Sequence, residues 1–131
     1  MSHERAPGEA ATKDRPPVDD TVLDQLAGIT DARGDSVLGE LLDAFLGAVP
    51  GRLDALDRAV AAGDASAVAT GAHALTGSAA SFGARGMADL CRELRAVADQ
   101  GDLDAARPLV AALRTEFLEV RAWLMNFRSP T

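Results

Sequence analysis

The sequence predicts an all-α protein, an antiparallel four-helix bundle with a short additional helix at its N-terminal end. Ala, Leu and Val dominate the chain, Tyr is absent and aromatic residues make up 4% of it, so strand-forming residues are too few for a sheet. Apolar residues recur every three or four positions, as one helical face requires. Four such segments are joined by short connections, which is typical of antiparallel bundles. The length of 131 residues predicts one domain.

Composition also narrows the class of function. The formal net charge is −7 and the positive charge is almost all Arg, with one Lys, which argues against nucleic-acid binding. Cys91 is the only cysteine, so no intramolecular disulfide can form, and a reducing cytoplasm fits. The N-terminus lacks the apolar segment of a secretory signal, and no apolar run approaches the ~20 residues that span a bilayer. We therefore expect a cytoplasmic protein that is neither exported nor embedded in a membrane.

Residues 1–18 differ in composition from the rest of the chain. They mix prolines and a glycine with charged residues and show no apolar period, so they cannot offset the entropy lost on ordering. We predict a disordered tail over 1–18 and a helical bundle over 19–128. His3 lies in the tail without neighbours arranged for a metal and is interpreted as a solvated residue.

The bundle is predicted to begin with a short helix near Asp19, where Thr21 and Asp24 resemble a capping box. Its apolar stripe is short, so we expect this helix to act as a lid on the other four. The stripe consists of Val22, Leu23, Leu26 and Ile29.

The first long segment carries apolar pairs every four residues from Val37 to Val49, and Leu53, Leu56 and Val60 continue the pattern. Pro50 interrupts the run, because proline removes a helical hydrogen bond, so a kinked helix or two abutting helices are expected. Gly63 ends the run.

Three further helices follow. Asp64 can cap the second long helix, which ends near Gly83. The third extends to Gly101, and Pro108 is expected near the start of the last one. The inward residues are Val68, Ala72, Leu75, Ala79 and Phe82; then Met87, Leu90, Cys91, Leu94 and Val97; then Val110, Leu113, Phe117, Val120, Leu124 and Phe127.

His73 is the candidate for chemistry. It follows Ala72 of the inward stripe and is therefore turned ~100° away from it, toward solvent. Helical side chains lean toward the N-terminus, so the side chains at positions 76 and 77 are the ones that would cover the imidazole. Gly77 has no side chain and leaves the ring uncovered on that side. A mid-helix glycine costs ~1 kcal/mol relative to alanine, and here it uncovers the ring. The outward face around His73 consists of Ala69, Thr70, Thr76, Gly77 and Ala80.

A neutral imidazole has a free lone pair and is a capable nucleophile. A metal site is not expected. The part of the chain predicted to be ordered has no second histidine, and no acidic residue follows His73 by three or four positions. No catalytic triad, carboxylate pair or phosphate loop is discernible, and we expect the outward face to offer no pocket, so an enzyme is not expected. A surface histidine of no consequence remains the alternative on exposure alone.

The segment 72–84, AHALTGSAASFGA, with Met87, Leu90, Cys91 and Leu94 after it, resembles the histidine-containing phosphotransfer (HPt) domain of bacterial multistep phosphorelays. The resemblance implies a four-helix bundle in which His73 receives a phosphoryl group from a receiver-domain aspartate and passes it to another. Implied partners are response-regulator receiver domains and a histidine kinase. The chain would be a stoichiometric carrier without a cofactor, because the receiver brings its own Mg²⁺ and lysine.

Two positions depart from the family pattern. The family usually has Lys where this chain has Thr76, and often Glu or Gln where it has Arg95. Thr76 can satisfy its hydroxyl on the carbonyl of Ala72. In an antiparallel hairpin turning near Gly83, residues 92–95 lie level with His73, so we hypothesise that the cation has moved to the next helix. A solvated Arg95 is the alternative.

Phosphate and partner contacts are accordingly predicted for Thr76, Gly77 and Arg95, and partner docking for Ala69, Thr70 and Ala80. Cys91 is interpreted as core, as are Trp123 and Phe127, and a monomer is expected. The alternative function is a degenerate HPt-like bundle that binds a signalling partner without phosphate. A dimerisation bundle is the third possibility.

Overall fold

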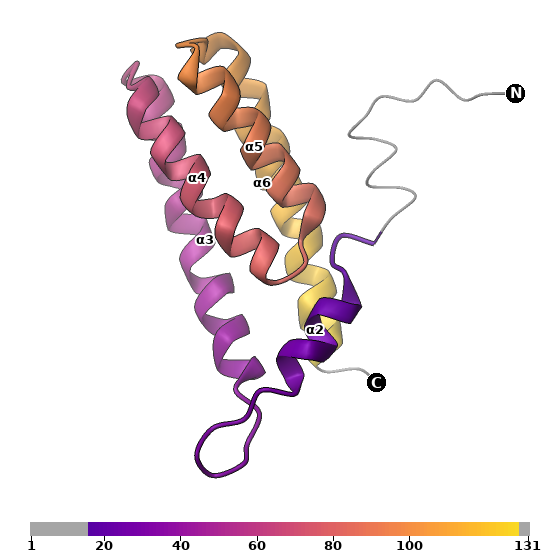
Figure 1. Ribbon diagram of the computed structural model, residues 1–131. Helices are drawn as coiled ribbons and strands as arrows, with labels where there is room; N and C mark the ends of the chain where they lie inside the picture. Colours follow the sequence, from indigo (N-terminus) through magenta and orange to yellow (C-terminus); the bar gives the residue numbers. More distant parts are fainter. Residues whose placement is uncertain (1–15, 129–131) are drawn as a thin grey trace, which may run out of the picture.

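The structure is a computed structural model that describes residues 16–128. Within this range it contains five helices and no strand beyond an isolated bridge between Thr30 and Ser36, so the predicted fold class is confirmed. The four long helices stand side by side, and α2 lies at one end (Figure 1). In chain order the helices are α2 (Asp20–Ala27), α3 (Leu38–Ala61), α4 (Ala65–Ser81), α5 (Arg85–Asp99) and α6 (Leu103–Arg128).

Each long helix packs against its neighbours in the chain, and α6 closes the bundle by packing against α3 as well as α5. The interior is formed by the predicted stripes. Val68, Ala72, Leu75 and Ala79 of α4 are fully buried. Phe82 is half-buried and packs against Phe45, with ring centroids 4.7 Å apart and the planes tilted by 36°. The buried residues of α5 are Met87, Ala88, Cys91, Leu94 and Ala98, and Leu90 and Val97 pack at the edge of the core.

The end of α6 also packs on the core. Trp123 and Phe127 are half-buried and stack on one another, with ring centroids 5.5 Å apart and planes 15° apart. This agrees with the prediction that they pack against the bundle. No helix among residues 16–128 has the length and apolar character needed to cross a membrane.

The N-terminal boundary differs from the prediction. Residues 1–15, with His3, lie outside the described range, but Val18 is fully buried, so the predicted tail over 1–18 extends too far into the fold. The capping box at Thr21 is also wrong. Asp19 caps α2, because its Oδ1 accepts from the Thr21 backbone N–H at 3.0 Å.

The two helical prolines are tolerated inside continuous helices. Pro50 lies within the single helix α3, so two abutting helices are excluded. The sequence predicts Pro108 near a helix start, but α6 begins at Leu103 and places it in the second turn. The reason is a cap further upstream: the side chain of Asp102 accepts from the Ala105 backbone N–H at 3.0 Å.

Gly83 determines how α4 turns into α5. Its φ of +74° is a left-handed conformation that favours glycine, as at Gly101, where φ is +75°. Gly83 additionally contacts the segment before α2: its carbonyl accepts from the Asp19 N–H at 2.9 Å, and an added Cβ would lie 2.9 Å from the Asp19 carbonyl oxygen. At Gly101 no atom lies within 4 Å of an added Cβ.

We therefore expect Gly83→Ala to lower the free energy of unfolding more than Gly101→Ala. Both variants incur the cost of left-handed backbone, about 1–2 kcal/mol. Only Gly83→Ala adds steric overlap, which typically costs about 1–3 kcal/mol more. Urea unfolding of the two variants beside the wild-type protein measures the difference, and equal losses would show that Asp19 can move aside.

Candidate functional site

His73 lies in the middle of α4 and its side chain is exposed. The preceding residue, Ala72, is fully buried against the other helices, which fixes the rotation of α4. Because successive helical residues are turned by ~100°, the burial of Ala72 directs the imidazole of His73 outward. The exposure comes from the packing of α4 and needs no distortion of the backbone.

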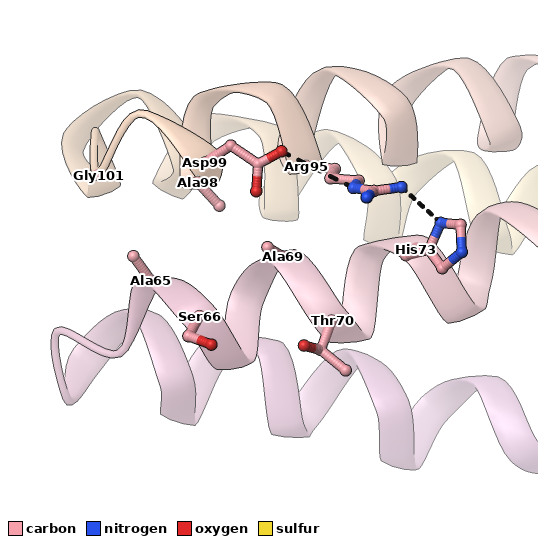
Figure 2. A pocket seen from close by; sticks show the side chains of 9 residues that line it. All are labelled: Ala65, Ser66, Ala69, Thr70, His73, Arg95, Ala98, Asp99 and Gly101. Atoms are coloured by element: carbon pink, nitrogen blue, oxygen red, sulfur yellow. Dashed lines mark hydrogen bonds and ion pairs between the residues drawn. The ribbon is translucent and has the colours of Figure 1, made fainter.

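Arg95 of α5 reaches this imidazole. Its Nη1 lies 2.7 Å from Nδ1 of His73 (Figure 2). The opposite edge of the guanidinium faces Asp99, with 3.8 Å between Nε and Oδ2. The side chains of Arg95 and Asp99 remain 47% and 59% exposed, so this network lies at the surface and is reachable from solvent.

The hydrogen bond between Arg95 and His73 has one possible direction. A guanidinium has five N–H donors and no acceptor, so Arg95 donates and Nδ1 accepts. Nε2 is the ring nitrogen on the side away from Arg95 (Figure 2). Of the two ring nitrogens, Nε2 is thus the one left open to a reactant.

Thr76 and Gly77 lie on the next turn of α4. The Thr76 hydroxyl donates to the carbonyl oxygen of Ala72 at 2.8 Å, the contact expected from the sequence. Its proton is therefore engaged with the helix backbone. An added Cβ on Gly77 would have no atom within 4 Å, so the fold itself does not require glycine at this position.

An open groove of about 580 Å³ runs between α4 and α5 beside His73. The expectation that this face offers no pocket is wrong, because small side chains along both helices leave room between them. The groove is lined by Ala65, Ser66, Ala69, Thr70, His73, Arg95, Ala98, Asp99 and Gly101 (Figure 2).

The predicted docking residues separate into two places. Ala69 and Thr70 line the groove with His73, although Ala69 is half-buried and also packs on the core. Ala80 is exposed but lines a different hollow, together with Val22 and Arg85. The structure thus brings together His73, Arg95, Ala69 and Thr70 and leaves Ala80 apart from this groove.

Sequence reasoning missed two acidic residues. Asp99 lies four residues after Arg95, a spacing that signals a helical ion pair. Glu116 of α6 is 5% exposed, and its Oε2 would lie 2.7 Å from a Cβ added to Gly86. No sequence pattern identifies Glu116, because its burial depends on the absence of a side chain on another helix.

Cys91 belongs to the core and not to the site. It is fully buried in α5, and burial raises the pKa of its thiol to about 12, so the reactive thiolate is disfavoured. Among the residues that the structure describes, no group of three His, Cys, Asp or Glu side chains could hold a metal ion.

Comparison with known proteins places this geometry in a family. The family model described as "Hpt domain" matches residues 40–123, which include His73, Thr76, Gly77 and Arg95. The chain belongs to the Hpt domain family. A solved structure, histidine-containing phosphotransfer protein B (HptB) from Pseudomonas aeruginosa PAO1, is similar with a TM-score of 0.81 and 33% identity. The match covers 88% of this chain and 97% of that one. The comparison with curated proteins finds no match.

Membership of the Hpt family supports a role in histidine phosphotransfer, in which a protein carries a phosphoryl group on an imidazole. Of the two histidines in the sequence, His73 alone lies within residues 40–123.

Proposed function

We propose that this protein relays a phosphoryl group between receiver-domain aspartates through His73. The observation that carries the proposal is that the one histidine in the Hpt match is exposed on α4, with Arg95 at Nδ1 and Nε2 on the other side of the ring. Gly77, one turn further along α4, has no side chain and lies in open space, so it does not obstruct a receiver aspartate that approaches Nε2.

In the proposed step Nε2 first gives up its proton to solvent or to the receiver, and its lone pair then attacks the phosphorus of an aspartyl phosphate. The P–N bond forms, the bond between phosphorus and the carboxylate oxygen breaks, and the carboxylate leaves with the electron pair. The reverse step returns the group to a second receiver. Such transfer needs mainly positioning and neutralisation of charge, and the receiver supplies Mg²⁺ and a lysine.

The protein is therefore proposed to be a monomeric, stoichiometric carrier without a cofactor of its own. Its partners are response-regulator receiver domains and a histidine kinase that charges the relay. A cytoplasmic location fits these partners. The small side chains of Ala69 and Thr70 beside His73, and the bare turn at Gly77, leave space for a receiver to dock.

The cation near the phosphoryl group is proposed to come from α5. Thr76 stands where the family usually has lysine, and its hydroxyl is engaged with Ala72. Arg95 places a guanidinium 2.7 Å from the ring instead. A permanently charged group at this distance can attract the transferring phosphoryl oxygens.

The missing lysine also motivates a second candidate, a bundle that binds a receiver without accepting phosphate. Both candidates use the same docking face, so binding alone does not separate them. Transfer of the phosphoryl group does.

Incubation with a panel of phosphorylated receiver domains is expected to transfer the phosphoryl group to this protein. The label should be acid-labile and base-stable, as phosphoramidates are, and His73→Ala should abolish it. His73 is exposed, so the variant should remain folded, which circular dichroism can verify. A receiver that forms a complex without labelling His73 would favour the second candidate.

Replacement of Gly77 by alanine should separate stability from function. A mid-helix Gly→Ala change in open space raises the free energy of unfolding by about 0.5–1 kcal/mol. The added methyl group on the docking face should slow transfer about tenfold, the effect of about 1.4 kcal/mol of overpacking.

Gly47→Ala is the matched control. Gly47 lies inside α3, is exposed and has no atom within 4 Å of an added Cβ. It should give the same gain in stability and leave the rate of transfer unchanged. A Gly77→Ala variant that transfers at the wild-type rate would show that a receiver does not approach this turn.

Removal of the cation tests the exchange between helices. We expect Arg95→Ala to slow transfer from a phosphorylated receiver by about tenfold or more, because a charge-assisted contact is worth about 1.5–3 kcal/mol. Adding Thr76→Lys to this variant should restore much of the rate. Single-turnover transfer assays measure both, and an Arg95→Ala variant as fast as wild type would refute the exchange.

A further inference from the structure

Nδ1 of His73 is held by a group that cannot accept a proton from it. Arg95 donates through Nη1 at 2.7 Å, and its opposite edge lies near Asp99. A guanidinium has no acceptor and does not deprotonate in proteins. As long as this contact persists, Nδ1 carries no hydrogen, and the neutral ring has its proton on Nε2.

The same contact has a consequence for the phosphorylated ring. With a phosphoryl group on Nε2, Nδ1 is the only ring nitrogen that can take a proton. When water attacks the phosphorus, the P–N bond breaks and its electron pair stays with the ring. The ring then leaves as neutral imidazole if Nδ1 is protonated, and as an imidazolate anion if Nδ1 is bare. The anion is much the poorer leaving group.

We propose that Arg95 is a positioning residue that preserves the phosphoryl group on His73. By donating to Nδ1 it excludes the proton that P–N cleavage requires, and it cannot supply that proton itself. The proposal rests on the proposed function of His73 as phosphoryl acceptor, and it adds a role for Arg95 distinct from attraction of the phosphoryl oxygens.

Transfer of the phosphoryl group and its retention on His73 then require opposite states of Arg95. For Nε2 to attack, its proton must be lost, and for the group to leave, Nδ1 must become protonated. Both events require the guanidinium to release Nδ1. Once released, it can attract the phosphoryl oxygens, and this attraction is why its removal still slows transfer. The 3.8 Å distance between Arg95 Nε and Asp99 Oδ2 gives the guanidinium a nearby carboxylate when it does so. The contact therefore distinguishes a resting carrier from one engaged with a receiver.

The first test needs no phosphoryl group. Two-bond ¹H–¹⁵N spectra of the ¹⁵N-labelled protein, recorded where the ring is neutral, report which nitrogen bears hydrogen. The wild-type protein is expected to show Nε2–H with a bare Nδ1, and Arg95→Ala a mixture of both tautomers. Arg92→Ala is the matched control, because Arg92 is exposed on α5 and pairs with Asp89 at 2.9 Å. A wild-type ring protonated at Nδ1 would overturn the proposal.

The second test measures lifetime. Phosphoramidate can load His73 without a receiver, since Nε2 displaces ammonia from phosphorus, and ³¹P spectra then follow the loss of the label. Arg95→Ala should lose it about fivefold faster than wild type, the factor that corresponds to one hydrogen bond of about 1 kcal/mol. Arg92→Ala should match wild type.

The double variant Arg95→Ala/Thr76→Lys separates the two roles of Arg95. Lysine at position 76 restores a cation for transfer but not the donor to Nδ1, so transfer should recover while the label remains short-lived. Equal lifetimes in wild type and Arg95→Ala would overturn this inference and leave the proposed function intact. Failure of phosphoramidate to load His73 would overturn both.

Discussion

The close packing of α4 against α5 is the constraint on which the site depends. The buried stripe of α4 includes Ala72 and Ala79, whose small side chains allow close packing in the bundle, and Gly83 reverses the chain between α4 and α5. This hairpin sets residues near 65 opposite residues near 101, and His73 opposite Arg95. The imidazole, the guanidinium and the groove beside them all follow from that register.

The two faces of α4 serve different ends. On the buried face Ala72 contributes packing, and Gly71 lies so near α3 that an added Cβ would be 3.0 Å from Cδ2 of Leu56. On the exposed face Gly77 meets nothing within 4 Å, so there the absence of a side chain serves no packing in the monomer. Glycine thus has a structural cause at position 71, whereas the fold gives it none at position 77, where we propose that a receiver docks.

Much of the fold is predictable because the spacing of apolar residues shows where the helices are and which faces they bury. The stripe of α4 and the cap at Asp64 follow from spacing and residue type alone, and the structure shows both. Boundaries are harder, because caps compete. Asp19 rather than Thr21 caps α2, and the Asp19 backbone N–H also donates to the Gly83 carbonyl across the fold. Likewise Asp102 starts α6 before Pro108, and local sequence does not rank these alternatives.

The site is predictable to the level of helical register and no further. An antiparallel turn near Gly83 places position 95 beside His73, but the choice of Nδ1 over Nε2 depends on the side-chain conformations in three dimensions. The sequence does not predict the groove, because its volume comes from small side chains on two helices that lie side by side. The ion pair of Asp99 with Arg95 can be predicted from the sequence, because an acidic residue four positions after an arginine commonly pairs with it on a helix.

The proposed exchange of a lysine for an arginine on the neighbouring helix would change more than the position of a charge. A lysine one turn after the histidine, on a flexible stem, would act as a point charge for phosphoryl oxygens. Arg95 comes from across the helix pair, with a planar fork whose two edges face Asp99 and Nδ1 of His73. In the proposed relay, a group so placed would act on the ring as well as on the phosphate. The cation that we propose for the relay is therefore one that contacts the imidazole directly and influences its protonation, which a lysine at position 76 would not do.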